Sequence, residues 1–179
     1  MPSPNHGPRP AGAVVTLVVI HAISLPPGQY GGPQVEQFFQ NRLDWDAHPF
    51  FQQIRGLEVS AHFFLRRDGE VVQCVPTSRR AWHAGRSSWQ GQDNCNDYSV
   101  GIELEGADGQ AFEPAQYASL VRLMQALAQH HGPLAVAGHE HVAPGRKTDP
   151  GPGFDWPHLR AQLGWPAAGF PADAGPAPG

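Results

Sequence analysis

The sequence predicts a fold of the α/β (α+β) class, because strand-like and helix-like patterns both occur along it. Residues 14–20 are apolar and β-branched, which is typical of a strand covered on both faces. Residues 134–137 form a second short apolar run, bounded by Gly-Pro and by Gly. Residues 114–131 repeat apolar side chains at three- and four-residue steps and stop at Gly132-Pro133, which indicates a core-packing helix.

The 179 residues suffice for one domain with a substantial core. Residues 1–13 are expected to be a flexible lead-in, residues 14–165 the folded domain, and residues 166–179 a disordered Pro/Ala/Gly tail. Cys74 and Cys95 are too few for a disulfide framework, so we expect both to be free thiols.

Charge and hydropathy argue against several classes of partner. The net charge is −4 and no Lys/Arg-rich run occurs, so no nucleic-acid partner is expected. No apolar stretch approaches 20 residues, so no membrane span is expected. The first apolar run lacks the flanks of a signal peptide, which predicts a cytoplasmic protein. The sequence gives no sign of an obligate protein partner.

A tight turn is predicted at Arg67-Asp68-Gly69, because Asp-Gly between two strand-like runs is a strong hairpin signal. The flanking runs are residues 61–66 and 70–75. His62 lies inside the first run, where we expect a packed, hydrogen-bonded histidine rather than a ligand. Cys74, in the second run, is expected to act as a small buried hydrophobic residue.

Two shorter helices are predicted outside the long one. Pro33 suits the first turn of a helix that carries an apolar stripe, and Asp155 suits the cap of another with Pro157 in its first turn. The first of these helices belongs to a loop-rich block that begins at Ala22 and runs for about 40 residues. Such a long connection in a compact domain predicts a lid or wall beside a site.

The strand predicted at residues 100–104 carries two carboxylates on one face. Val100, Ile102 and Leu104 alternate on one side, so Glu103 and Glu105 share the other. That second face is either solvated, or it looks into a cleft where one carboxylate acts as a general base. The alternation alone leaves both interpretations open.

A loop rich in proline and glycine follows the apolar run 134–137. His139 and His141 come where that strand ends, and Lys147 and Asp149 lie within the loop. A rigid loop at the end of a strand is a common place for a site, although a solvated surface turn is the alternative. His21 likewise closes the first strand, either as a ligand or base or as a half-buried structural histidine.

Two neutral imidazoles and one carboxylate would suffice to bind a catalytic zinc ion and leave a fourth position for water. The sequence has neither an HExxH nor a CxxC motif, so spacing by itself leaves zinc as one hypothesis, with His139 and His141 as competing ligands. Residues 79–89 mix Trp82, His83 and Arg86 with glycine and serine. They form either a sugar- or peptide-binding wall or a loop whose tryptophans cover the edge of the core.

Several segments together resemble a known family. The specific ones are His21-Ala22-Ile23-Ser24-Leu25-Pro26-Pro27-Gly28 and Arg146-Lys147-Thr148-Asp149-Pro150-Gly151-Pro152, supported by residues 59–62, 81–85, 101–106 and 138–139. From about residue 14 to residue 163 the chain resembles the zinc-dependent N-acetylmuramoyl-L-alanine amidases, a group related to the peptidoglycan recognition proteins. It is most similar to the branch that acts on 1,6-anhydro muropeptides in cell-wall recycling.

The resemblance implies a mixed β-sheet with helices on its faces and a Zn²⁺ site in a groove. It places the zinc ligands on His21, His139 and Asp149, the general base on Glu103, and a lysine that stabilises the transition state on Lys147. Residues 14–165 would be the amidase catalytic domain. The reaction implied is hydrolysis of the amide between the lactyl group of N-acetylmuramic acid and L-alanine of the stem peptide.

Substrate recognition is predicted to involve Trp82, His83, Arg86 and Asn94. Glu58 and Asn94 stand where basic residues of relatives would meet stem-peptide carboxylates, and Arg86 could substitute for them. The partner implied is a small soluble muropeptide. Two alternatives are a recognition module that binds muropeptide without cleaving it and a general cell-wall amidase. The first is disfavoured because relatives of that kind lose a zinc ligand, and here none is lost.

Overall fold

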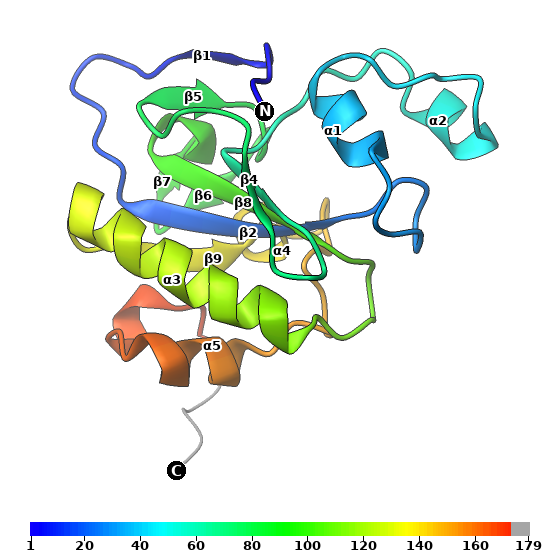
Figure 1. The fold of residues 1–179 in the computed structure, drawn as a ribbon. Helices are drawn as coiled ribbons and strands as arrows, with labels where there is room; N and C mark the ends of the chain where they lie inside the picture. Colours follow the sequence, from blue (N-terminus) through cyan, green and yellow to red (C-terminus); the bar gives the residue numbers. More distant parts are fainter. Residues whose placement is uncertain (173–179) are drawn as a thin grey trace.

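The computed structural model describes residues 1–172 and is built on a five-stranded mixed sheet (Figure 1). Four of its strands run parallel, and the edge strand β4 pairs antiparallel with β3. The predicted fold class is therefore confirmed. In spatial order the strands are β4 (Val71–Gln73), β3 (Phe63–Leu65), β8 (Ser99–Glu105), β2 (Leu17–Ile23) and β9 (Ala135–Gly138).

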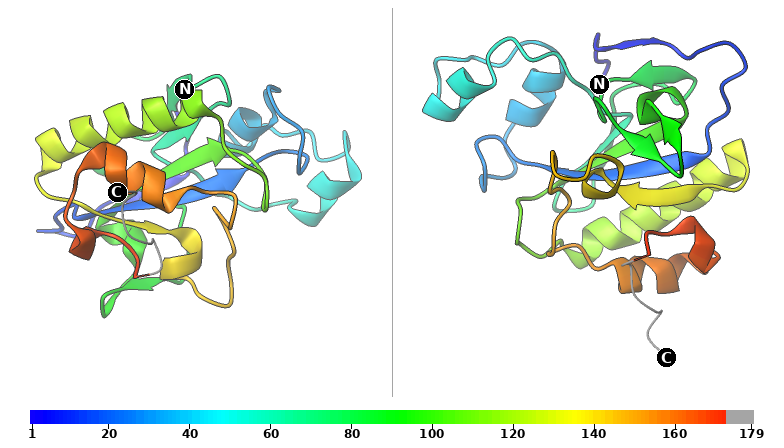
Figure 2. Two further views of the ribbon diagram at one scale, coloured as in Figure 1. Left: turned by 90° about the horizontal axis from the view of Figure 1, so that it is seen from below. Right: turned by 180° about the vertical axis from the view of Figure 1, so that it is seen from behind.

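One face of the sheet is covered by two helices, α3 (Pro114–His131) and α5 (Trp156–Leu163), as Figure 2 shows. Val18 and Ile20 of β2 and Ile102 of β8 contribute to the larger apolar cluster beneath these helices. The helix predicted from periodicity has the bounds expected of it, because Pro114 opens it and Gly132, with φ 89°, ends it.

The opposite face of the sheet carries smaller elements around a second apolar cluster, to which Leu17 and Val19 of β2 contribute. Because side chains alternate along a strand, His21 shares this face with Leu17 and Val19. The elements here are β6 (Ser88–Trp89), β7 (Gln92–Asp93), the 3₁₀ helix η1 (Cys95–Asp97) and α4 (His139–Val142).

The block that follows β2 forms a separate lobe beyond the carboxyl end of that strand (Figure 1). Its helices are α1 (Gln34–Phe39) and α2 (Pro49–Gln53), and His48 Nδ1 caps the second by accepting a hydrogen bond from the Phe50 amide. An apolar cluster of its own, including Phe39 and Phe51, holds the lobe against β3.

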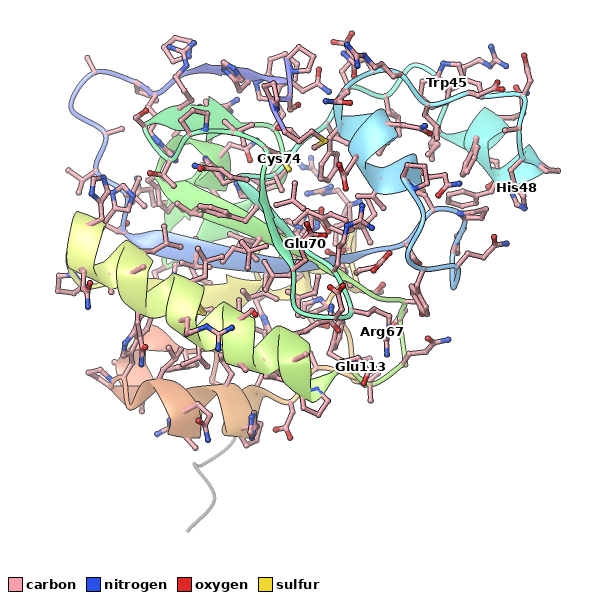
Figure 3. The ribbon with its side chains drawn as sticks, viewed as in Figure 1. Trp45, His48, Arg67, Glu70, Cys74 and Glu113 are labelled. Atoms are coloured by element: carbon pink, nitrogen blue, oxygen red, sulfur yellow. The ribbon has the colours of Figure 1, made fainter. Side chains whose placement is uncertain are left out.

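The predicted hairpin is confirmed as β3 and β4 joined at Gly69. Its turn is tied to the start of α3, where Arg67 forms an ion pair with Glu113; the two side chains meet in Figure 3.

His62, just before β3, is fully buried. Its Nδ1 accepts a hydrogen bond from the Gly101 amide and its Nε2 faces the Arg79 carbonyl, as expected of a packed histidine. Cys74 is a buried free thiol, also as expected.

The prediction of a flexible segment at residues 1–13 is wrong. Strand β1 (His6–Pro8) pairs antiparallel with β5 (Arg79–Ala81). Arg9 donates hydrogen bonds to the carbonyls of Thr77, Asn96, Asp97 and Ser99 at 2.8–3.2 Å. The segment has few apolar residues, so hydropathy suggested disorder, but its backbone and one guanidinium satisfy polar groups that would otherwise be buried without partners.

The predicted tail is also wrong over its described part. Residues 167–169 form a short 3₁₀ helix, η2 (Ala167–Gly169), and Phe170 is buried in the larger core cluster. The ring of Phe170 gives this Pro/Ala/Gly-rich stretch an apolar group to bury, which its overall composition did not suggest. The remainder of the expected tail, residues 173–179, lies outside the described residues. Among the helices of residues 1–172, none is long and apolar enough to cross a membrane.

Candidate active site

Parallel pairing of β2 with β8 brings the first two candidate residues together. His21 and Glu103 are directly opposite each other in the register of these strands and lie on the same face. His139 is the first residue of α4, immediately after β9, which pairs with the other edge of β2. Asp149 lies on the loop that follows α4. Side chains from β2, from β8, from the start of α4 and from the loop after α4 therefore meet near the carboxyl end of β2.

The side chains of His21, His139 and Asp149 form a cluster whose geometry fits a metal ion. The Nδ1 atoms of the two histidines are 3.0 Å apart, and they lie 3.3 and 3.1 Å from Asp149 Oδ2. A tetrahedral zinc ion with bonds of about 2.0–2.1 Å holds its ligand atoms about 3.3 Å apart. His139 Nε2 faces the Ala84 carbonyl, so it donates there and leaves the Nδ1 lone pair directed at the cluster.

The charge states favoured in the cluster are those that a cation requires. Burial, aided by the neighbouring His139, lowers the pKa of His21 to about 4, although the Asp149 carboxylate opposes the shift. Burial alone would raise the pKa of Asp149, but the neighbouring His139 and His21 hold it well below its usual range. The set is therefore a neutral imidazole beside an ionised carboxylate, the protonation states of metal ligands.

Glu103 stands beside this cluster without belonging to it. Its side chain is buried, and Oε2 has no hydrogen-bond partner among residues 1–172. Burial raises the pKa of Glu103 well above its ordinary value, Asp149 raises it further, and Lys147 opposes the shift. A buried carboxylate with an unpaired oxygen is costly to keep unless something binds there, so the geometry reserves this oxygen for a ligand or a proton transfer.

A cavity of about 360 Å³ opens in front of these groups. Its polar side includes Glu103, His139, Asp149 and the exposed Lys147. Its opposite side is apolar and comes largely from the lobe after β2. The apolar lining residues are Ile23, Leu25, Phe38, Phe50, Ile54, Leu57 and Val59.

Four residues were predicted to bind substrate, and the structure brings one of them to this cavity. His83 lines it but is 8% exposed, with Nδ1 toward His21 and Nε2 toward Ser99. Trp82 is half-buried outside the lining, and Arg86 and Asn94 are exposed away from it. Their proposed contact with substrate stays a prediction.

The apolar wall of the cavity was not assigned residue by residue from the sequence. The signal was the unusual length of the block after His21, which predicted a lid or wall. In the sequence, the residues of this wall cannot be distinguished from ordinary core residues. In the structure, Leu57 differs from the other wall residues because it is 51% exposed, at the rim of the cavity. Asp108, from the turn after β8, also lines the cavity and was missed.

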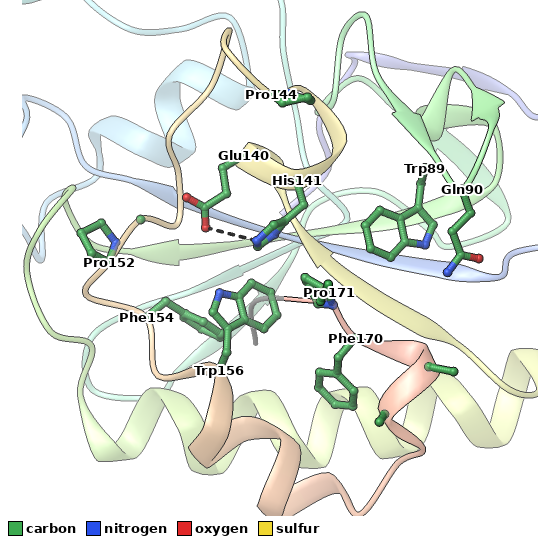
Figure 4. A pocket seen from close by; sticks show the side chains of 14 residues that line it. Trp89, Gln90, Glu140, His141, Pro144, Pro152, Phe154, Trp156, Phe170 and Pro171 are labelled. Atoms are coloured by element: carbon green, nitrogen blue, oxygen red, sulfur yellow. Dashed lines mark ion pairs between the residues drawn. The ribbon is translucent and has the colours of Figure 1, made fainter. Parts of the chain in front are cut away.

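A larger cavity, of about 1210 Å³, is shown in Figure 4, and none of the three cluster residues lines it. Trp89, Phe154 and Trp156 line it, together with His141, whose ring packs edge-on to Trp156. His141 Nδ1 accepts a hydrogen bond from the Gly138 amide, so this histidine is directed away from the metal-type cluster. Of these two competing candidates, the fold therefore places His139 in the cluster and His141 outside it.

The sheet brings together two buried histidines, an aspartate and a glutamate whose Oε2 has no partner among residues 1–172, which is the set of groups that metallohydrolases use. The sequence profile of the N-acetylmuramoyl-L-alanine amidase family matches residues 11–152. The chain belongs to this family, as the motifs in its sequence indicated. Relatives of about 50% identity narrow the comparison further.

The 1,6-anhydro-N-acetylmuramyl-L-alanine amidase AmpD of Salmonella typhimurium (strain SL1344) is 52% identical over 163 residues, which cover 90% of this chain and 87% of that protein. AmpD of Escherichia coli (strain K12) is 51% identical over 162 residues, covering 89% and 88% of the two chains.

Solved structures give the same result. The crystal structure of a Se-Met AmpD derivative superposes with a TM-score of 0.89 at 50% identity, covering 91% of this chain and 92% of that one. The amidase AmiD from E. coli, in complex with anhydro-N-acetylmuramic acid-L-Ala-D-γ-Glu-L-Lys, superposes with a TM-score of 0.61 at 29% identity, covering 86% and 59%.

Proposed function

We propose that the protein hydrolyses the amide bond between the lactyl group of 1,6-anhydro-N-acetylmuramic acid and L-alanine in soluble muropeptides. The observation that carries the proposal is the buried Glu103 carboxylate, whose Oε2 has no partner among residues 1–172, beside the cluster of His21, His139 and Asp149. The substrate class is supported by relatives of about 50% identity that are named for this reaction, and by the anhydromuropeptide bound to the more distant AmiD.

The ion that the cluster would hold is zinc, with His21, His139 and Asp149 as its ligands. The nitrogen and oxygen donors and their separations suit it. Zinc, when bound, supplies Lewis-acid chemistry that activates water at neutral pH. Side chains of the cavity carry out the proton transfers and stabilise the charge that develops on the substrate.

Glu103 is the general base and then the general acid. Its carboxylate takes the proton of the attacking water and delivers it to the nitrogen of L-alanine as the amide bond breaks. Burial makes this carboxyl basic, so it can retain the proton until the amine leaves. Lys147, whose side chain is exposed at the cavity, supplies positive charge for the lactyl carbonyl oxygen as that oxygen becomes anionic.

The apolar half of the cavity would receive the sugar. Closing the 1,6-anhydro ring converts two hydroxyl groups into one ether oxygen, so the anhydro sugar is rigid and less polar than its open form. The wall from Phe38 to Val59 suits such a face, and it excludes water from one side of the reacting bond.

The metal assignment is tested with ligand variants and a matched histidine control. Purified His139→Ala and Asp149→Ala should lose bound zinc in elemental analysis, whereas His141→Ala, on the same short helix as His139 but directed away from the cluster, should retain it. Stoichiometric zinc in both ligand variants would refute the assignment. Loss of zinc from all three would show that the control does not separate His139 from His141, and would also count against the assignment.

The substrate assignment is tested on two muropeptides that differ only in the anhydro ring. Mass analysis should detect release of the stem peptide from both, with a higher kcat/KM for the anhydro form. Equal kcat/KM values together with rapid digestion of intact sacculi would favour the general wall amidase. The cytoplasmic location stays a prediction, which cell fractionation would test.

A further inference from the structure

The segment His83-Ala84 lies behind both histidines of the metal-type cluster. His83 packs against β8 at Gly101, where a Cβ atom would come within 2.4 Å of the His83 ring. An alanine at position 101 could not share this space with the imidazole. The absence of a side chain on Gly101 therefore makes room for His83 at this point of the fold.

The direction of each hydrogen bond of His83 follows from the hydroxyl group of Ser99. The Ser99 hydroxyl lies 2.5 Å from the Cys95 carbonyl, which can only accept, so its single hydrogen is used there. Ser99 Oγ must therefore accept from His83 Nε2 across 3.2 Å. A neutral His83 that donates from Nε2 carries a lone pair on Nδ1.

The same assignment continues into the cluster. His83 Nδ1 lies 2.9 Å from His21 Nε2 and, as an acceptor, requires the hydrogen of His21 to be on Nε2. His21 Nδ1 then carries the lone pair, and this is the atom that lies within 3.3 Å of His139 Nδ1 and Asp149 Oδ2. The chain Cys95–Ser99–His83 thus determines which nitrogen of His21 faces the metal-type site.

The second histidine is oriented by the next residue along the backbone. The Ala84 carbonyl accepts from His139 Nε2 at 3.3 Å, which leaves His139 Nδ1 for the cluster. The amides of His83 and Ala84 both donate to Asn96 Oδ1, at 3.1 and 2.8 Å, and Asn96 is buried. One dipeptide, anchored by one buried amide, therefore orients both imidazoles.

We propose that His83 is a positioning residue, which together with Ser99 holds His21 as the Nε2–H tautomer and so makes Nδ1 its metal-binding atom. The proposal rests on the metal cluster proposed above but goes beyond it, because it assigns a role to residues that contact no metal. It replaces the expectation that His83 recognises substrate. The alternative is that His83 merely fills the space above Gly101, and the two roles predict different results.

The decisive variants separate volume from hydrogen bonding. His83→Leu fills the space but offers no acceptor to His21, whereas the amide oxygen of His83→Asn can stand near the position of Nδ1. Partners in the second layer of a metal site typically contribute about 10–100-fold in metal affinity. We expect zinc affinity, measured by competition with a chromophoric chelator, to fall by about 10–100-fold in His83→Leu and by less than about 5-fold in His83→Asn.

Ser99→Ala extends the test, because Ser99 does not touch His21. With its acceptor gone, His83 is free to move its hydrogen to Nδ1, so zinc affinity should fall measurably although the cluster keeps every ligand. A residue that only fills space would transmit no such effect. Circular dichroism and thermal melting would verify that each variant is folded.

Tautomer assignment by NMR gives a readout that needs neither zinc nor activity. Long-range ¹H–¹⁵N correlations of the metal-free wild-type protein should show His21 with its hydrogen on Nε2, and Ser99→Ala should show a mixture. An Nδ1–H tautomer in the wild type, or unchanged zinc affinity in His83→Leu, would overturn the proposal. If the wild-type protein binds no zinc, the metal assignment fails, while the NMR result still decides the role of His83.

Discussion

Replacing Glu103 by glutamine separates the proposed base from the neighbouring carboxylate on the same strand face. The two residues differ sharply in their surroundings, although both are nearly buried, at 9% and 3% exposure. Glu103 faces the cavity and its Oε2 has no partner among residues 1–172. Glu105 lies outside the cavity lining and accepts hydrogen bonds from the Gly31 amide at 2.6 Å and the Arg67 amide at 3.1 Å.

The rate effects follow from these positions. General acid–base catalysis contributes about 10²–10⁴-fold, which is about 2.7–5.4 kcal/mol of activation free energy at about 1.36 kcal/mol per decade. Glu103→Gln should therefore lower kcat by at least about 100-fold while zinc stays bound, since the residue is not a ligand. Glu105→Gln should change kcat by less than about 5-fold, because its carboxylate serves the loop and hairpin rather than the cavity.

The stability effects should have opposite signs. Burial raises the pKa of Glu103 above its unfolded value, so the ionised side chain destabilises the metal-free fold increasingly as pH rises through the folded-state pKa. At pH 7.5 Glu103→Gln removes that penalty and should raise the free energy of unfolding, with the gain disappearing below about pH 4 where both states are protonated. Glu105→Gln loses charge-assisted hydrogen bonds and should lower the free energy of unfolding by about 1–3 kcal/mol.

The assay combines kcat on a soluble anhydromuropeptide, zinc content, and urea unfolding of the metal-free protein at pH 7.5. Equal loss of kcat in the two variants would refute the assignment of Glu103 as the base. A large loss of zinc from Glu103→Gln would refute it in another way, by making Glu103 part of the metal site.

Four further outcomes are expected. Burial lowers the pKa of His62 to about 3, so this histidine contributes to the free energy of unfolding above about pH 6.5 and the contribution is lost on acidification. In urea unfolding of the metal-free protein between pH 7.5 and 5, the wild type should therefore lose about 2 kcal/mol more unfolding free energy than His62→Gln. Arg9→Met should lower the unfolding free energy by about 2–3 kcal/mol and Tm by several degrees in calorimetry, because buried carbonyls lose their donor. Leu57→Ser should reduce the kcat/KM preference for the anhydro substrate about 5-fold, the equivalent of about 1 kcal/mol of lost apolar contact. Gly101→Ala should destabilise the fold by about 1–3 kcal/mol and weaken zinc binding in a chelator titration, because its Cβ displaces His83.

The sequence by itself determined the features that depend on neighbours along the chain. The long helix α3 followed from its periodicity and from Pro114 and Gly132 at its ends, and the hairpin followed from Asp68-Gly69. The motif residues identified the family, because a run such as residues 146–152 combines a cation, a carboxylate and turn formers in a specific order.

Hydropathy failed where a segment is held by hydrogen bonds rather than by apolar side chains. Residues 1–13 have too little apolar surface to predict order, yet β1 pairs with β5, and Arg9 reaches carbonyls more than 60 residues away in the sequence. No local pattern reports such partners, since they are backbone groups that every residue has.

Only the tertiary structure decided how the candidate residues of the site converge. Glu103 and Glu105 are equivalent in the alternating pattern. In the fold, Glu103 faces the cavity beside the lobe after β2, whereas Glu105 accepts a hydrogen bond from the hairpin turn at Arg67. His83, which the sequence assigns to a substrate wall, lies in the fold with its Nδ1 2.9 Å from His21 Nε2, a contact between residues 62 positions apart that no local pattern predicts. The physical reason is that the register of parallel strands is set by packing across the whole sheet, and register determines which side chains meet.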